Sequence, residues 1–413
     1  MRRYNQTAVE WSMKVQEIIL RAIAKKITWI QAASIIGISA RQMRRWLRRY
    51  EGYGYDGLFD RRKGKQSPRK VPLAEVEKIL GLYRDEYFDL NVRHFHEKLV
   101  EEHEIKLSYT WVKAALQGAG FVKQGRKRGV HRKRRPRRPM VGMMLHIDGS
   151  KHQWFKDNRW HDLIVIMDDA NSEIYYAQLV DEESTATVMA GLREVIEQKG
   201  IFCSMYSDRA SHFFFTPKAG GKVDKDRPTQ VARALKELGI EPIAAYSPQA
   251  RGRSERGFRT WQGRLPQELR LAKIATLEAA NLFLREKYIG VYNGKFSVKP
   301  AQPGSAFVPV KGKDLDLVFA TRHDRVVARD NTVSLANCCF QIEQTKWRNT
   351  LAGCAVGVYE LADATITITY GSHVVGRYTA QGVALDSEHT KRVKIGSRTT
   401  PSTKLSGKRL AVS

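Results

Sequence analysis

The sequence predicts a multidomain protein with an all-α N-terminal third, a mixed α/β central domain and a small β-rich C-terminal domain. At 413 residues, the chain is too long for one ordinary core. Apolar residues recur at helical spacing in the N-terminal third, whereas short apolar runs alternate with helical segments after Pro139. We assign residues 1–62 and 70–122 to two helical domains, 123–140 to a linker and 141–300 to the α/β domain. Residues 310–385 are assigned to the β-rich domain and 386–413 to a tail.

The net charge indicates the class of partner. The chain carries 71 Lys and Arg against 43 Asp and Glu, a formal charge of +28. The positive charges repel one another, so an excess of this size usually indicates that the protein binds a polyanion. Nucleic acid fits best, because neither an amphipathic anchor nor a membrane span accompanies the charge. Double-stranded DNA is therefore the expected partner, and a merely soluble basic protein is the alternative.

The four cysteines, Cys203, Cys338, Cys339 and Cys354, form no CxxC pair. This usage favours a reduced compartment over a disulfide framework or a zinc site. The first residues lack the apolar core of a signal peptide, and no run of eighteen apolar residues occurs. We therefore expect a cytoplasmic protein that stays with any DNA in that compartment.

Residues 14–50 have the pattern of a helix-turn-helix. After a first helix, Thr28 and Gln31 form a capping box of the type that begins a helix, and Gly37 ends that helix. Ser39 begins the next helix, with Gln42 at the matching position. A short helix, a glycine turn and a second helix are typical of DNA-binding proteins.

The second helix of this motif, about residues 40–50, has two distinct faces. Met43, Trp46, Leu47 and Tyr50 repeat at three- and four-residue spacing and should face inward. We expect the outward face to bind DNA, because guanidinium groups read guanine edges and clamp phosphates. A solvated charged face is the alternative. The candidate DNA-binding residues on this helix are Arg41, Gln42, Arg44, Arg45, Arg48 and Arg49.

Residues 70–122 predict a second helical DNA-binding unit, and a basic linker follows it. Pro72 suits the start of one helix, and Gly120 suits the end of the last. The linker holds ten Lys or Arg among the seventeen residues 123–139, with no acid, so it can follow a phosphate backbone. Its candidate DNA-binding residues are Arg132, Lys133, Arg134 and Arg135.

The central domain predicts a mixed α/β sheet with acids at the ends of apolar strands. Three strands in succession are followed by helix, strand, helix, strand and helix. Asp148 and Asp208 each follow an apolar strand, and Glu255 opens the last helix. The expected strands are 143–147, 163–167, 174–180, 201–206 and 241–245, and the expected helices are 184–199, 228–238 and 253–269.

Three carboxylates from different elements are suited to hold divalent ions about 4 Å apart for phosphoryl transfer. Mg²⁺, with Mn²⁺ as a substitute, prefers such oxygen ligands, whereas zinc favours His or Cys. Asp168 and Asp169 are rival candidates, but they favour a turn. Asp157 and Asp162 favour a hairpin. His146, Trp154, Trp160 and Trp261 favour packing roles.

The motifs HIDGS around Asp148, YSDRASHF around Asp208 and SPQARGRSERGFRTWQ around Glu255 resemble the acidic motifs of transposases and integrases. The whole chain resembles an insertion-sequence transposase of the ISNCY kind. The resemblance implies a ribonuclease H-like core in which Asp148, Asp208 and Glu255 coordinate catalytic Mg²⁺. It also implies binding to terminal inverted repeats, strand cleavage and strand transfer by a homodimer or higher homo-oligomer.

The resemblance has one departure. Forty-six residues separate Asp208 from Glu255, whereas such cores often have about thirty-five there, and we assign the excess to an insertion at 212–229. Basic residues around Glu255 are candidates for holding DNA phosphate. These candidates are Arg251, Arg253, Arg256 and Arg259, with Ser247 and Gln249 beside them.

The C-terminal portion predicts five short strands at period two, over 325–335, 338–344, 357–361, 365–370 and 373–378. We expect a small β-barrel of the SH3-like kind, followed by a basic disordered tail from 386. Two other functions remain open. One is a non-catalytic DNA-binding regulator that retains the integrase fold, and the other is a nuclease of ribonuclease H type.

Overall fold

The computed structural model describes residues 6–59, 70–125, 136–218, 221–224, 226–246, 252–345 and 347–385; the side chain of Arg253 is not described. The chain divides into two compact units. The first comprises Met1–Phe88 and Thr110–Lys123, and the second comprises Asp89–Tyr109 and Gln124–Ser413. In the described part of the chain, no helix is long and apolar enough to cross a membrane.

The predicted helix-turn-helix forms as expected. Its elements are α1 (Gln6–Ile23), α2 (Trp29–Ile36), α3 (Ala40–Tyr53) and the short 3₁₀ helix η1 (Gly54–Leu58). Thr28 and Gln31 form the reciprocal capping box, and Gly37 has a left-handed φ of 80° that ends α2. Ser39 accepts from the Gln42 amide at the start of α3. Small and aliphatic side chains of α1 and α2 close a core around Met43.

Three helices follow: α4 (Leu73–Asp85), α5 (Val92–Glu101) and α6 (Tyr109–Gly118). Pro72 directly precedes α4 and is not its first residue. Asn91 caps α5, because its side chain accepts from the His94 amide. Helix α5 belongs to the second compact unit, although the sequence places it within a continuous helical segment.

The central region is a five-stranded mixed sheet of order β3-β2-β1-β4-β5. Strands β1 to β3 are antiparallel neighbours, whereas β4 and β5 run parallel to β1. This topology confirms the predicted mixed sheet and is consistent with a ribonuclease H-like core. The strands are β1 (Leu145–His152), β2 (His161–Asp168), β3 (Ile174–Val180), β4 (Ser204–Ser207) and β5 (Glu241–Ala244).

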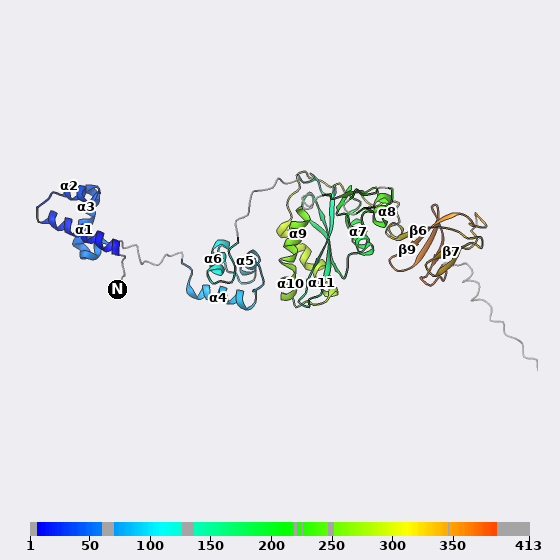
Figure 1. Ribbon diagram of the computed structural model, residues 1–413, viewed down its shortest axis with the longest axis horizontal. Helices are drawn as coiled ribbons and strands as arrows, with labels where there is room; N and C mark the ends of the chain where they lie inside the picture. Colours follow the sequence, from blue (N-terminus) through cyan, green and yellow to red (C-terminus); the bar gives the residue numbers. More distant parts are fainter. Residues whose placement is uncertain are drawn as a thin grey trace, which may run out of the picture. The chain divides into compact units, whose positions relative to one another are not determined.

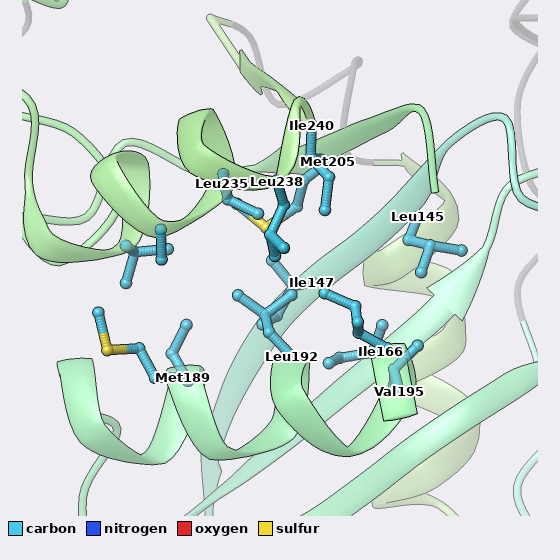
Figure 2. Close-up of a cluster of buried hydrophobic side chains, with 14 of the residues drawn as sticks. Leu145, Ile147, Ile166, Met189, Leu192, Val195, Met205, Leu235, Leu238 and Ile240 are labelled. Atoms are coloured by element: carbon cyan, nitrogen blue, oxygen red, sulfur yellow. The ribbon is translucent and has the colours of Figure 1, made fainter. Parts of the chain in front are cut away.

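Helices cover both faces of the sheet (Figure 1). On one face, β1 side chains such as Ile147 pack with α7 (Thr185–Lys199) and α8 (Gln230–Leu238) (Figure 2). The other face packs Trp154 and Trp261 with the remaining helices of the core, and these two tryptophans are buried as predicted. Those helices are α9 (Gly252–Gln262), α10 (Leu265–Leu271), α11 (Leu277–Phe283), the π-helical turn η3 (Leu284–Tyr288) and α12 (Ile289–Phe296).

Two asparagines occupy the outer edge of β3. Asn293 accepts from the Ile174 amide at 2.8 Å and donates to the Ile174 carbonyl at 2.9 Å. Asn281 makes the same two bonds with Leu179, at 2.7 and 2.8 Å. The side-chain amides therefore satisfy edge groups that a further strand would otherwise pair.

Several predicted boundaries and one burial assignment are wrong. The first strand does not end before Asp148 but continues to His152, because β2 pairs with it as far as His161. The predicted helix 253–269 is two helices, separated at Gly263 and Arg264. Trp160 is 55% exposed in the loop between β1 and β2 and is not a core residue.

The segment predicted as an insertion, 212–229, contributes partly to the core. Phe213 and Phe214 are buried among the side chains of α7 and α8. Thr229 caps α8 by accepting from the Ala232 amide. The described ends of this segment are therefore packed, and residues 219–220 and 225 lie outside the description.

The C-terminal region is β-rich, as predicted, but the SH3-like barrel is not confirmed. Its described strands form an open four-stranded sheet, β11-β10-β9-β6, and a β7-β8 hairpin. The single strand expected at 325–335 is two strands with a turn between them. After the short helix α13 (Leu315–Val318), the strands are β6 (Thr321–Val326), β7 (Thr332–Leu335), β8 (Cys338–Gln341), β9 (Ala355–Glu360), β10 (Ile366–Tyr370) and β11 (His373–Tyr378).

Candidate catalytic site and nucleic-acid interface

The arginine face predicted on α3 is present. Met43 is fully buried, and Trp46, Leu47 and Tyr50 are half-buried in the same core. The opposite face is exposed, and none of its five arginines forms an ion pair with a described residue. Its exposed residues are Arg41, Gln42, Arg44, Arg45, Arg48 and Arg49. The helix thus presents a concentrated positive charge, and its contact with DNA stays a prediction.

Two of the three predicted acids stand on neighbouring parallel strands. Leu145 pairs with Met205, and His146 pairs with Tyr206. Continuing this register by two residues sets Asp148 opposite Asp208, directly after β4 ends. Neighbouring strands lie about 4.8 Å apart, so the two acids occupy adjacent positions on the interior strands of the sheet, where β4 ends beside β1.

Asp148 faces the side of the sheet that α9 covers. Along β1, Leu145 and Ile147 enter the core with α7, and the alternating residues His146 and Asp148 face the other way. Asp148 is buried and lines a small pocket together with Ser254 and other α9 residues. The helix that carries Glu255 therefore lies over the strand that carries Asp148.

The rival acids of the core have structural partners. Asp168 accepts from the amides of Gly142 and Ala170, both at 2.7 Å, and burial raises the pKa of its carboxyl. Asp169 binds the buried His146 ring, at 2.7 Å between Oδ1 and Nε2. These contacts agree with the predicted turn and with the predicted packing role of His146.

Glu255 is exposed in the first turn of α9. Among the described residues, no three His, Cys, Asp or Glu side chains gather closely enough to hold a metal ion. The structure thus brings Asp148 and Asp208 together and does not group Glu255 with them. Arg256 and Arg259 are exposed on the same helix.

Part of the predicted DNA-binding set cannot be placed. Arg132, Lys133, Arg134, Arg135 and Arg251 lie outside the described residues, as do Ser247 and Gln249, and so does the side chain of Arg253.

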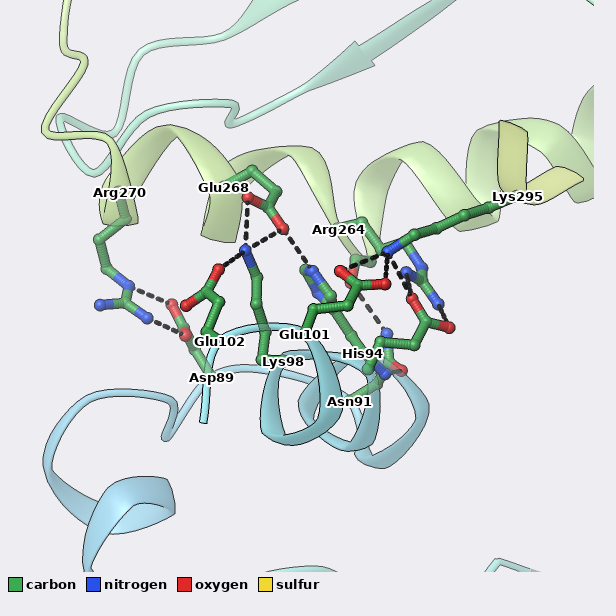
Figure 3. A network of polar contacts seen from close by, with 12 residues as sticks. Asp89, Asn91, His94, Lys98, Glu101, Glu102, Arg264, Glu268, Arg270 and Lys295 are labelled. Atoms are coloured by element: carbon green, nitrogen blue, oxygen red, sulfur yellow. Dashed lines mark hydrogen bonds and ion pairs between the residues drawn. The ribbon is translucent and has the colours of Figure 1, made fainter. Parts of the chain in front are cut away.

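A network of ion pairs, which local sequence patterns did not reveal, joins α5 to α10 (Figure 3). The buried Arg264 binds Glu97 through two hydrogen bonds of 2.7 and 3.0 Å. Lys295 contacts Glu97 at 3.2 Å and Glu101 at 2.8 Å. Burial opposes ionisation of Glu97, but Arg264 and then Lys295 outweigh it and lower the pKa of this carboxyl from 4.5 to about 2.

A second set of pairs reverses the charges. Glu268 on α10 accepts from the buried His94 at 2.6 Å and from Lys98 at 3.1 Å, both on α5. Lys98 also binds Glu102 at 2.8 Å. Burial again opposes ionisation, yet these partners lower the pKa of Glu268 from 4.5 to about 2. Each helix therefore supplies both signs of charge.

The ends of this interface are also bonded. Asp89 binds Arg270 through two hydrogen bonds of 2.7 and 2.8 Å. Asn91 donates to the carbonyl of Gly263, which directly follows α9, at 3.0 Å. Gln262 donates from the last residue of α9 to Ser150 on β1 at 2.9 Å. The C-terminal end of the Glu255 helix is therefore fixed to both α5 and β1.

Comparison with known proteins identifies the family. The chain is 30% identical to the protein named "Putative transposase y4bF" of Sinorhizobium fredii, over 86% of this chain and 78% of that protein. The chain belongs to the transposase family. The chain is also 29% identical to the transposase for insertion sequence IS1202 of Streptococcus pneumoniae, over 78% of this chain and 76% of that protein. The predicted family is thereby confirmed.

Two family profiles match the N-terminal third of this transposase. A helix-turn-helix domain matches residues 16–66, and a homeodomain-like domain matches residues 42–116. The first match spans α2 and α3 and agrees with the predicted helix-turn-helix.

Solved structures similar to this transposase include two viral integrases. The integrase catalytic core domain of HTLV-2, in complex with magnesium, is 12% identical and has a TM-score of 0.27, over 35% of this chain and 83% of that chain. The simian T-cell lymphotropic virus intasome, in complex with a PP2A regulatory subunit, is 11% identical and has a TM-score of 0.31, over 65% of this chain and 91% of that chain.

Proposed function

We propose that this transposase cuts DNA at the terminal inverted repeats of its element and joins the ends to target DNA, with Mg²⁺ held by Asp148, Asp208 and Glu255. The observation that carries the proposal is the strand register that sets Asp148 opposite Asp208. The membership of the transposase family supports it independently. Two paired DNA ends would require at least a homodimer.

The donor set fits the ion. Asp148 and Asp208 offer carboxylate oxygens, which suit Mg²⁺ or Mn²⁺ better than zinc. Glu255, in the first turn of α9, would complete the set with a third carboxylate. When bound, the ion supplies activation of the attacking oxygen and charge stabilisation of the leaving oxygen.

The remaining residues would orient DNA. The exposed arginines of α3 would read the terminal repeat, as would the second helical unit. Arg256 and Arg259, exposed beside Glu255, would hold phosphate near the acids. The basic segment with Arg132, Lys133, Arg134 and Arg135 and the candidate Arg251 and Arg253 would add phosphate contacts.

The substitution Asp208→Asn tests the assignment. It removes a charged oxygen donor while keeping the shape of the side chain. We expect Mg²⁺-dependent strand joining to fall by more than the roughly 10–100-fold that is typical for losing a partner of a metal ligand. Binding to the terminal repeat, measured by gel shift, should stay within about twofold. Full joining activity in this variant would sink the catalytic assignment.

Asp157→Asn is the matched control. Asp157 lies in the loop between β1 and β2 and pairs with Arg159. The same chemical change at this position should leave both joining and binding unchanged.

A non-catalytic DNA-binding regulator is the second candidate function. The observation that favours it is the exposed Glu255, which is not grouped with the other acids in the described residues. A regulator would bind the terminal repeat without any Mg²⁺-dependent cleavage. Wild-type protein that binds but does not cut under any Mg²⁺ or Mn²⁺ concentration would establish this alternative.

A further inference from the structure

The glycine that follows Asp148 lies in close contact with the side chain of Glu183. A Cβ added to Gly149 would lie 2.7 Å from Cδ of Glu183, and nearer still to Oε2. Real side chains do not tolerate such a contact, so any larger residue at 149 would displace the Glu183 carboxylate. Glycine in the HIDGS motif thus leaves room for a second acid to pack against the strand beside Asp148.

The Glu183 carboxylate is held from several directions. Its Oε1 binds Nε2 of His212 at 3.0 Å, and both side chains are mostly buried, at 20% and 13% exposed. The Glu183 amide donates to Asp162 on β2 at 3.0 Å, and Ser184 caps α7 directly afterwards. Glu183 is therefore held both at its backbone amide and at its carboxylate.

His212 belongs to the turn that follows Asp208. Asp208 accepts from the Ala210 amide at 2.9 Å, and the Phe213 amide donates to the Ala210 carbonyl at 2.9 Å. Phe213 is buried in the core, so the far end of this turn is anchored. The Glu183–His212 bond therefore ties the turn that begins at Asp208 to the segment lying on Gly149.

Glu183 and His212 lie on the face of the sheet opposite to the Asp148 carboxylate. Because side chains alternate along a strand, position 149 faces the α7 side of β1, whereas Asp148 faces α9. Glu183, directly before α7, therefore touches the backbone next to Asp148 from the opposite face. This placement suits support of the two carboxylates and does not suit ligation of an ion between them.

We propose that Glu183 and His212 are positioning residues that hold the Asp208 turn against the Asp148–Gly149 segment. Two carboxylates about one strand spacing apart repel each other until a cation is bound. The side-chain hydrogen bond between Glu183 and His212 holds the two segments together, resists this repulsion and preorganises the two acids for an ion. The proposal rests on the proposed metal site at Asp148 and Asp208.

The test measures Mn²⁺ binding by the full-length chain without DNA, by electron paramagnetic resonance. We expect His212→Ala and Glu183→Ala each to weaken Mn²⁺ binding by about tenfold, because the acids lose their support. The double variant should be no weaker than either single variant, since both remove the same interaction. His212→Gln, whose amide can donate to Glu183, should recover most of the affinity.

A variant on the other side of the contact keeps the test independent of His212. Gly149→Ala should displace the Glu183 carboxylate and weaken Mn²⁺ binding to a similar degree, and the unfolding midpoint shows whether the fold survives. Folded single variants with wild-type Mn²⁺ affinity, or additive losses in the double variant, would overturn the proposal.

Asp208→Asn separates this inference from the proposed function. If Asp208→Asn binds Mn²⁺ as tightly as the wild type, the metal site itself is wrong. If Asp208→Asn loses binding while His212→Ala and Gly149→Ala keep it, only the positioning role is wrong.

Discussion

The arginines of α3 and those of the α10 region show two uses of the same side chain. Arg45 and Arg48 are exposed, and neither forms an ion pair with a described residue. Arg264 and Arg270 are mostly buried, and each binds one carboxylate through two hydrogen bonds. The charges of Arg45 and Arg48 are therefore available for an external polyanion. Those of Arg264 and Arg270 are desolvated and neutralised by carboxylates of the same chain.

The difference teaches that a basic composition does not by itself locate a nucleic-acid surface. Glu97 on α5 and Asp89 before it neutralise Arg264 and Arg270, which lie 167 and 181 residues further along the sequence. On α3, by contrast, no described acid forms an ion pair with the five arginines, and this leaves an open arginine face. Stability should therefore depend on one set of arginines and DNA recognition on the other.

The largest expected effect is on stability. Arg264→Glu places a second carboxylate against the mostly buried Glu97, and breaking a buried pair costs about 3–5 kcal/mol. The free energy of unfolding, measured by urea denaturation, should fall by that amount. Adding Glu97→Arg should restore part of it, and only part because Lys295 also contacts this position.

Arg45→Glu on the exposed face is its control and should change stability by no more than about 0.5 kcal/mol. Equal losses from Arg45→Glu and Arg264→Glu would remove the distinction between the two regions.

The next effect is on recognition. Arg45→Ala with Arg48→Ala should reduce discrimination between the terminal repeat and random DNA, by about 1–3 kcal/mol for each arginine that reads a base. Competition gel shifts at fixed salt measure it, and stability should not change. Arg159→Ala is the control, because Arg159 is exposed, is paired with Asp157 and lies in the loop between β1 and β2, outside both helical units. Unchanged discrimination in the double variant would mean that another element reads the sequence.

A smaller effect concerns pH. The folded state lowers the pKa values of Glu97 and Glu268 from 4.5 to about 2. Their contribution is thus complete above pH 4.5 and is lost as the pH falls towards 2. The unfolding free energy of the wild type should decrease across this window, and that of Glu97→Gln should decrease less steeply. Identical slopes would show that the Glu97 pair is not linked to folding.

The smallest effect is expected at the rim of the same interface. Asp89 is 27% exposed and its partner Arg270 is 17% exposed, so solvent screens this pair more than it screens Arg264. Asp89→Asn should cost about 1 kcal/mol or less. Asp85→Asn on α4, whose pair with Arg84 is largely exposed, should cost nothing measurable. A larger loss from Asp85→Asn than from Asp89→Asn would contradict this ranking.

Sequence periodicity predicted the features that depend on near neighbours. The inward Met43 and outward arginines of α3 follow from helical spacing, and the capping box of Thr28 follows from residues three apart. The succession of strands and helices along the central region was predicted from the same kind of local pattern. The prediction for Trp160 was wrong because an apolar residue type does not by itself specify burial. Trp160 lies in a loop and is exposed.

Features that depend on distant partners could not be predicted. Polar residues after Asp148 hid the continuation of β1, which exists because β2 pairs with it. Nothing near Glu97 in the sequence indicates Arg264, and nothing near Gly149 indicates Glu183. The candidate acids were found from motifs, but their support comes from contacts between segments that only the fold brings together.

The two asparagines of α11 and α12 that bind the edge of β3 have a consequence for assembly. Asn281 and Asn293 already use the backbone groups of Leu179 and Ile174 that an incoming strand would need. A second subunit could extend the sheet at this edge only by breaking four hydrogen bonds and moving α11 and α12 aside. The edge is thereby protected against cross-chain β-addition, so subunits that pair two DNA ends would have to meet through other surfaces.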